Sequence, residues 1–199
     1  MIYCYLVRHG QDDTSVRGGW SENGLTEKGR LQAVRLAEKF AQREAPEIHR
    51  IYSSDLPRTM ETAQPVADAL GLTVIPRKDF REVNNGLLAG MDNDLALEQY
   101  PGLFWNRMRW NQRYPQGESP REFYDRIRRA WRGFSAELVQ AQENAILVTH
   151  GGVISLLEDL VSGVRYSNRE RHRWISCTAV VPLVYREGHW HLEREAKKD

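Results

Sequence analysis

The sequence has 199 residues, of which 41% are hydrophobic and 28% are charged, and its formal net charge is +1. This length and composition are typical of one globular domain with a sizeable core. The small charge argues against a nucleic-acid partner or an anionic membrane surface, and no apolar run approaches the ~20 residues that a membrane span needs.

The cysteines and the first residues indicate the compartment. Cys4 and Cys177 are the only cysteines, and no Cys-x-x-Cys pair occurs, so neither a disulfide framework nor a zinc site is predicted. Residues 1–7 lack the basic region of a signal peptide. We therefore expect a cytoplasmic, reduced protein without a cofactor, and the sequence leaves a homodimer open.

The first predicted elements are a strand, a loop and a helix. The apolar run at residues 3–7 predicts a buried strand, and the polar, glycine-rich residues 11–24 predict a loop. Residues 26–29 should open a helix that ends before Pro46. Its apolar stripe is expected to comprise Leu31, Val34, Leu36, Ala37 and Phe40.

A second strand–helix unit follows. Residues 50–53 predict a strand, and Asp55 is expected to cap the next helix, with Pro57 in its first turn. Gly71 should end that helix, because glycine readily adopts the left-handed conformation of a C-cap. Residues 72–75 predict a third strand.

The segment 79–118 is less regular, and we interpret it as an insertion with short helices. After it, Ser119 and Glu122 match a capping box that opens a long helix through Leu138. Residues 145–149 predict a strand and 151–161 a helix. Residues 178–185 and 189–192 predict a closing strand pair, and the charged tail 193–199 is expected to fray.

Strands that alternate with helices predict an α/β fold. We expect one domain over residues 1–199, a three-layer sandwich whose mostly parallel sheet is flanked by helices, with an inserted helical lid at approximately 79–118. Ligands of such sheets bind beyond the carboxyl ends of the strands. His9, residues 54–58 and His150 all follow predicted strands, so they should meet at one edge.

Five residues near that edge supply the groups that move a phosphoryl group without a metal: Arg8, His9, Arg58, Glu82 and His150. An imidazole with one unprotonated nitrogen can attack phosphorus. Guanidinium groups match the geometry and charge of phosphoryl oxygens. A carboxylic acid can protonate the leaving oxygen.

The chain resembles the histidine phosphatase superfamily, the phosphoglycerate-mutase-like fold. Residues 6–10 (Leu-Val-Arg-His-Gly), 53–63 and 148–152 (Val-Thr-His-Gly-Gly) are similar to its signature segments. Arg81-Glu82 with Asn85-Gly86, and Gly117-Glu118-Ser119 with Arg126, are similar to the stretches around its acid and its lid. These pieces occur in family order over nearly the whole chain.

The resemblance implies a role for each residue. His9 would be the nucleophile that forms a phosphohistidine, Arg8 and Arg58 would bind the phosphoryl group, and His150 would stabilise the transition state. Glu82 would act as acid and then as base. The Gly151 amide would lie at an anion-binding helix start. Gln11, Ser15, Gly18 and Trp20 are candidates for substrate contacts, with a purely structural role in the loop as the alternative.

Three departures bear on the activity. Gln11 replaces the family's usual Glu and Ser15 its usual Asn, and the paired-arginine, proline-rich segment of the mutases is absent. The absence of that segment favours a phosphatase of a small phosphorylated metabolite. A mutase-type phosphotransferase and a catalytically idle domain that binds phosphorylated ligands are the alternatives.

Several other residues have two interpretations. Asp79, Asp92 and Asp94 compete with Glu82 as the acid. His189 and His191 could bind a metal, but we favour exposed strand residues. Residues 105–113 carry three arginines and two tryptophans without an acid, and form either a lid over an anionic site or a surface helix. The solvated face of the long helix is expected to hold Arg126, Arg128, Arg129 and Arg132.

Overall fold

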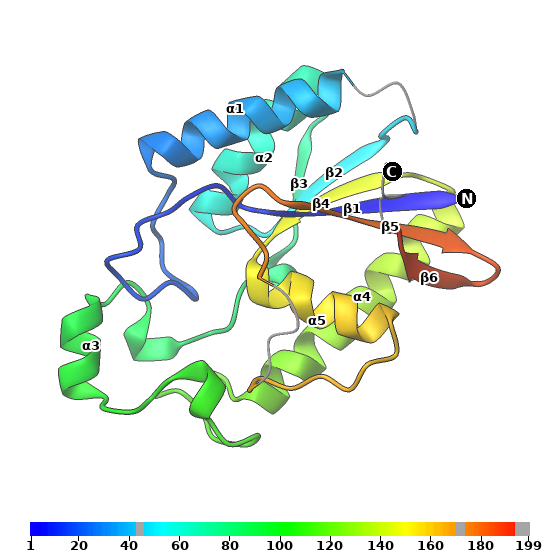
Figure 1. The fold of residues 1–199 in the computed structure, drawn as a ribbon. Coiled ribbons are helices and arrows are strands. Elements are labelled where there is room, and N and C mark those ends of the chain that lie inside the picture. The colour runs from blue at the N-terminus through cyan, green and yellow to red at the C-terminus, as the bar shows by residue number, and fades with distance from the viewer. Residues whose placement is uncertain (43–45, 170–173, 194–199) are drawn as a thin grey trace, which may run out of the picture.

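The structure is a computed structural model that describes residues 1–42, 46–169 and 174–193. Its described strands form one six-stranded sheet in the order β3-β2-β4-β1-β5-β6 (Figure 1). The strands are β1 (Ile2–Arg8), β2 (Arg50–Ser53), β3 (Val74–Pro76), β4 (Ala145–Thr149), β5 (Val180–Arg186) and β6 (His189–Leu192). The first four are parallel, and β5 and β6 add an antiparallel edge. The predicted α/β fold with a mostly parallel sheet is therefore confirmed.

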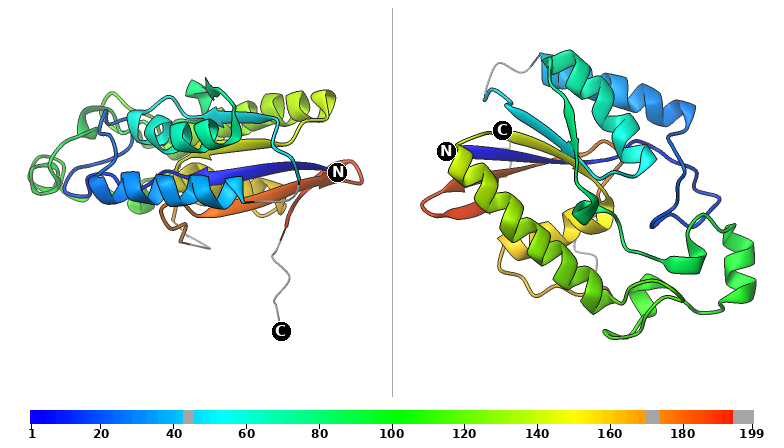
Figure 2. Two further views of the ribbon diagram at one scale, coloured as in Figure 1. Left: turned by 90° about the horizontal axis from the view of Figure 1, so that it is seen from above. Right: turned by 180° about the vertical axis from the view of Figure 1, so that it is seen from behind.

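Alternating side chains of the central strands enter two separate cores. In β1, Cys4 and Leu6 join one core and Tyr5 and Val7 the other, because successive side chains of a strand point to opposite faces. Helices α4 (Pro120–Ala141) and α5 (Gly151–Val161) pack on the first face. Helices α1 (Glu27–Ala41) and α2 (Pro57–Leu70) pack on the second (Figures 1 and 2). These are the three predicted layers.

Helix α1 begins where predicted, and three residues of its expected stripe, Leu36, Ala37 and Phe40, are buried, but the other two are not. The Thr26 hydroxyl accepts a hydrogen bond from the Gly29 amide and so caps the helix. Leu31 and Val34 were expected in the apolar stripe, yet they are about half exposed, at 55% and 48%. Because α1 packs closely on α2, the buried face is the row of side chains that starts at the small Gly29. The buried residues are Gly29, Ala33, Leu36, Ala37 and Phe40.

The predicted cap of α2 is wrong. Leu56 occupies the cap position without a side-chain hydrogen bond. The Asp55 carboxylate instead accepts two hydrogen bonds from the Arg81 guanidinium, at 2.5 and 2.8 Å. A bidentate, charge-assisted pair is stronger than a bond to a backbone amide. The other end matches the prediction, because Gly71 has φ of 65°.

The segment between β3 and α4 contains only short elements. They are 3₁₀ helices at Lys78–Phe80, Gly86–Leu88 and Trp105–Arg107, and α3 (Asn93–Gln99). In both figures this segment and the loop after β1 project beyond the same end of the sheet. The predicted capping box then opens α4, since Ser119 and Glu122 exchange side-chain-to-backbone bonds.

The predicted closing pair is the β5–β6 hairpin, which turns at Glu187 and Gly188, both with positive φ. Most of the predicted frayed tail, residues 194–199, lies outside the described residues. In the ranges that the structure describes, no helix combines the length and the apolar character needed to cross a bilayer.

Candidate active site

Two imidazoles lie side by side at the carboxyl ends of neighbouring strands. His9 follows β1 and His150 follows β4, and the register of these parallel strands pairs Arg8 with Thr149. The His9 amide donates to the Thr149 carbonyl at 3.0 Å. The ring centroids are 5.2 Å apart, and both rings are buried. The strand order thus brings the two predicted histidines together.

The surroundings of His9 set its proton state. Its Nδ1 lies 2.7 Å from the Gly10 carbonyl oxygen. Because a carbonyl only accepts, Nδ1 carries the proton and Nε2 keeps its lone pair. Burial, and then the Arg58 charge, lowers the pKa of His9 to about 3. His9 is therefore a neutral imidazole with a free nucleophilic nitrogen.

His150 is held between an arginine and a serine. Nη2 of Arg58 lies 3.2 Å from Nδ1, and since arginine has only donors, Nδ1 accepts. Nε2 then carries the proton and donates to the Ser54 hydroxyl at 2.9 Å. Burial, followed by the Arg58 charge, holds the pKa of His150 well below its usual value. Ser54 belongs to the segment 54–58 that we expected at this edge, although its bond to His150 was not predicted.

Arg58 is anchored by the loop after β1. Its guanidinium donates to the carbonyls of Ser21 at 3.1 Å and Gly19 at 2.7 Å, and its Nε lies 3.4 Å from the Asp12 carboxylate. Burial lowers the pKa of Arg58. Burial also raises the pKa of Asp12, and the nearby Arg58 charge lowers it in part. Sequence reasoning missed Asp12, because only the fold brings the loop back onto Arg58.

Arg8, the last residue of β1, is held by the segment that precedes β5. Its Nη1 donates to the Ile175 carbonyl at 2.5 Å, and its guanidinium lies over the Trp174 ring at 5.5 Å. Its buried Nε has no hydrogen-bond partner among the described residues. An ideal Cβ on Gly151, the first residue of α5, would lie 3.6 Å from that Nε. Arg8 and the start of α5 therefore adjoin, which suits an anion.

The Glu82 carboxylate also meets the start of α5. One oxygen accepts from the Gly152 amide at 3.0 Å and the other from the Val83 amide at 3.1 Å. A Cβ on Gly152 would lie 2.4 Å from the carboxylate, so only glycine allows this approach. The carboxylate is therefore held by an amide that lies two residues after His150 in the sequence.

The expectation for Arg126 is wrong. It was placed on the solvated face of α4, but only 19% of its side chain is exposed. It donates to the carbonyls of Asp79, Arg81 and Glu82 and pairs with Glu118 at 2.6 Å. These carbonyls belong to an irregular segment without a strand partner, so they need side-chain donors. The other three arginines of that prediction, Arg128, Arg129 and Arg132, are exposed.

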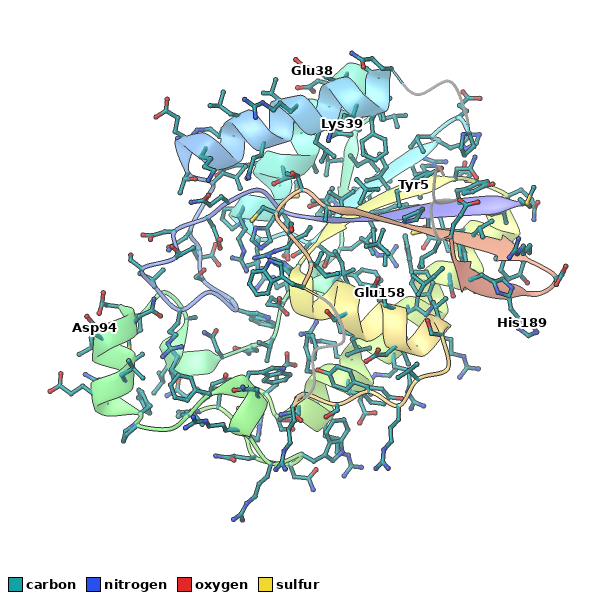
Figure 3. The ribbon with its side chains drawn as sticks, in the orientation of Figure 1. Tyr5, Glu38, Lys39, Asp94, Glu158 and His189 are labelled. Atoms are coloured by element: carbon teal, nitrogen blue, oxygen red, sulfur yellow. The ribbon has the colours of Figure 1, made fainter. Side chains whose placement is uncertain are left out.

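The competing acids lie elsewhere. Asp79 is exposed, and Asp92 caps α3 by accepting from the amides of Asp94 and Leu95. Asp94 lies on the outer side of α3 (Figure 3). None of the three has a recorded contact with the imidazoles or with Arg8 and Arg58 in the described part of the chain. Glu82 is thus the predicted acid that the fold brings to the site.

The four loop candidates make structural contacts. The Gln11 carbonyl accepts from Thr26 at 2.9 Å, and the Ser15 hydroxyl donates to Asp13 at 2.7 Å. The Gly18 carbonyl accepts from Asn85 at 3.2 Å. The Trp20 indole donates to the Glu82 carbonyl at 2.7 Å. Contact of these residues with a substrate stays a prediction.

The segment 105–113 is amphipathic rather than basic throughout. Trp105 packs inward on Tyr114 and Phe123, with centroids 6.3 and 5.5 Å apart. Arg113 pairs with Glu122 at 3.0 Å, Arg107 lies over the Phe104 ring at 5.4 Å, and Arg109 is exposed. These contacts favour the surface interpretation over a lid of free cations.

The two histidines of β6 lie far from this site. His189 is exposed at the hairpin, at the end of the molecule opposite Asp94 (Figure 3). His191 is only partly exposed, with its Nε2 enclosed, so the prediction of exposure holds for His189 alone. Among the residues with described positions, no group of three or more His, Cys, Asp or Glu side chains could hold a metal ion.

Comparisons with known proteins agree with this geometry. The sequence profile of the histidine phosphatase superfamily (branch 1) matches residues 4–197. The probable phosphoglycerate mutase GpmB of Escherichia coli O1:K1 / APEC is 32% identical over 197 residues, which cover 96% of this chain and 88% of that protein. The solved structure of a mycobacterial glucosyl-3-phosphoglycerate phosphatase superposes with a TM-score of 0.80 at 27% identity, covering 97% of each chain. Bacillus stearothermophilus YhfR superposes with a TM-score of 0.83 at 26% identity, covering 98% of this chain and 96% of that one.

Proposed function

The chain belongs to the histidine phosphatase superfamily, and we propose that it is a metal-independent phosphomonoesterase that hydrolyses a small phosphorylated metabolite through a phosphohistidine. A phosphatase or mutase-like activity follows from the family. The observation that best supports hydrolysis through His9 is its neutral imidazole with a free Nε2, on a ring that adjoins His150 and is exposed to the charges of Arg58 and Arg8.

In the first step, Nε2 of His9 attacks phosphorus. The nitrogen–phosphorus bond forms while the phosphorus–oxygen bond to the alcohol breaks, and protonated Glu82 gives its proton to the leaving oxygen. Arg8 and Arg58 bind the phosphoryl oxygens, where negative charge is concentrated. The buried Nε of Arg8, which lacks a partner among the described residues, supports this role.

In the second step, water attacks the phosphohistidine. Glu82 is now a carboxylate and takes a proton from the water as the new phosphorus–oxygen bond forms. The nitrogen–phosphorus bond breaks, its electron pair returns to His9, and phosphate leaves. Glu82 regains its proton, so the cycle closes without net change in the enzyme.

His150 requires a change of tautomer to donate to the phosphoryl group. Its Nδ1 accepts from Arg58, and its Nε2 donates to Ser54. A hydroxyl can also donate, so Ser54 can support the tautomer in which Nδ1 carries the proton. When a phosphoryl group draws Arg58 to its oxygens, Nδ1–H of His150 becomes a second donor to them.

A mutase-type phosphotransferase is the second candidate, supported by the probable phosphoglycerate mutase among the relatives. It would use the same five residues but return the phosphoryl group to a substrate hydroxyl. The absence of the mutases' paired-arginine segment from the sequence favours hydrolysis. An idle binding domain is less well supported, because a binder does not need the glutamate held at the start of α5.

The test is a panel of phosphorylated metabolites and p-nitrophenyl phosphate, scored in parallel for inorganic phosphate and for isomerised phosphoester. We expect phosphate from the wild type and labelled protein after a neutral quench with ³²P substrate. His9→Ala should give neither, since no other group takes the phosphoryl. Turnover by His9→Ala at a tenth of the wild-type rate would contradict the covalent mechanism, and isomer without phosphate would favour the mutase.

A further inference from the structure

A cavity of about 490 Å³ lies beside the candidate active site. Its walls combine four polar side chains with apolar and aromatic ones. The polar residues are Arg17, Asn85, Asn106 and Arg169, and the aromatic residues are Phe104, Trp105 and Tyr114. This size is within the range of sites that enclose small ligands.

The cavity shares a wall with the phosphoryl-binding groups. Asn85 accepts from the Trp20 amide and donates to the Gly18 carbonyl, both at 3.2 Å. The residue between them, Gly19, accepts from Arg58 through its carbonyl at 2.7 Å. One short loop therefore lies between the cavity and the arginine of the site.

Tyr114 also connects the cavity to the proposed acid. Burial raises the pKa of Tyr114 to about 12, while the charge of Arg17 lowers it and the charge of Glu82 raises it. Both charges thus act on one hydroxyl in the cavity wall. Trp20 links the same two places, because its indole donates to the Glu82 carbonyl at 2.7 Å and its amide donates to Asn85 in the cavity wall. A ligand whose phosphoryl group lies near Glu82 can therefore extend toward this space.

Arg17 has no anionic partner among the residues that the structure describes. Its guanidinium makes no hydrogen bond or ion pair with the described residues, and its Nε is enclosed. Its recorded interaction is with the Phe104 ring, at 5.3 Å from the centroid. A partly buried cation without a counter-charge is unfavourable unless a ligand supplies one. Arg113, in contrast, already pairs with Glu122.

We propose that this cavity binds the distal half of the substrate and that Arg17 binds a second anionic group there, separate from the transferred phosphoryl group. The inference rests on the proposed function and narrows its substrate class to phosphomonoesters with a further acidic group. A guanidinium pairs with a carboxylate through two parallel hydrogen bonds. The aromatic residues supply apolar surface beside that pair.

The test uses matched substrates. 3-Phosphoglycerate and 6-phosphogluconate carry a carboxylate at two distances from phosphorus, and glycerol 3-phosphate and sorbitol 6-phosphate carry a hydroxymethyl group in its place. We expect Arg17→Gln to lower kcat/KM by about 10–100-fold for at least one acid, mainly through KM, and by only a few-fold for its neutral partner. Arg17→Lys should retain part of the preference, and Arg132→Gln, an exposed arginine on α4, is the control.

Binding provides a readout that does not depend on turnover. In His9→Ala protein, calorimetry should show the same loss of affinity for the preferred acid when Arg17→Gln is added. Equal losses for acids and neutral partners, or no loss for either acid, would overturn the inference. Failure of the proposed function would look different: the wild type would release no phosphate even from p-nitrophenyl phosphate, while the binding difference could persist.

Discussion

The Ser54 hydroxyl lies 2.9 Å from Nε2 of His150, on the side of the ring opposite the nitrogen that accepts from Arg58. The serine can accept from Nε2–H or donate to an unprotonated Nε2. It therefore supports both tautomers of His150. In the proposed mechanism only the tautomer with a proton on Nδ1 donates to the phosphoryl group.

Ser54→Ala should lower kcat by about tenfold, because a buried hydrogen bond contributes ~1 kcal/mol and its loss leaves Nε2 unsatisfied. The effect should be larger on kcat than on KM. Ser53→Ala is the control, since the Ser53 hydroxyl bonds to the Ser54 carbonyl and not to the imidazole. ¹⁵N spectra of His150 with vanadate bound should show a tautomer change in the wild type that the variant lacks. Equal loss in both variants would assign Ser54 a purely structural role.

Glu82→Gln should slow substrates according to how much their leaving oxygen needs a proton. General acid catalysis contributes about 10²–10⁴-fold, so an alkyl phosphate should lose far more than p-nitrophenyl phosphate. Arg126→Met should show a weaker form of the same pattern, since Arg126 binds the Glu82 carbonyl. Steady-state kcat/KM for both substrates measures this. Equal losses for the two substrates with Glu82→Gln would mean that another group is the acid.

The main groups of the site could be predicted because they follow strands. Parallel strands bring their carboxyl ends to one edge, so His9 and His150 had to be neighbours once β1 and β4 were adjacent. Arg126 was missed because its partners are backbone carbonyls about 45 positions away. A signal existed, since Arg126 lies beside Ile127 and one turn from Phe123 and Ala130, all buried.

Other errors arose where tertiary contacts override local preference. Asp55 has the residue type of a helix cap, but Arg81 offers its carboxylate two charged bonds. Leu31 and Val34 are apolar, but the row that faces α2 and the sheet starts at Gly29 and Ala33, and these two positions lie on its other side. Asp12 and Arg17 lie in a loop that has no helical or strand-like repeat of apolar residues. No sequence pattern therefore predicts which of its charged side chains points into the protein.

Activity should survive EDTA and be blocked by vanadate. In the proposed mechanism, Arg8, Arg58 and the Nδ1–H of His150 supply the stabilisation that Mg²⁺ provides in other phosphoryl-transfer enzymes. The measurement is phosphate release after exhaustive chelation, with and without added divalent metal. Loss in EDTA that a metal restores would contradict this account and would return His189 and His191 to consideration as ligands.

Stability should fall as the pH falls from 7 to 5. The folded-state pKa of His9 is about 3 and that of His150 is also lowered, whereas an unfolded histidine titrates near 6.5. Below that value the unfolded chain binds protons that the folded chain does not. The stability that comes from keeping these rings neutral is therefore present above about pH 6.5 and is lost as the pH falls toward 3. Each histidine contributes up to about 1.4 kcal/mol per pH unit to the free energy of unfolding.

Urea unfolding in phosphate-free buffer at pH 7, 6 and 5 measures this slope. The double variant His9→Asn, His150→Asn should show a shallower dependence than the wild type, because asparagine does not titrate. His189→Asn is the matched control, since that ring is exposed. The pH range of the experiment stops at 5 because of Asp12, whose pKa is raised in the folded state. At lower pH, protonation of Asp12 favours the folded state and so opposes the effect of the two histidines. If the double variant keeps the wild-type slope, the two rings are not buried as neutral groups, and a protonated His9 could not act as the nucleophile.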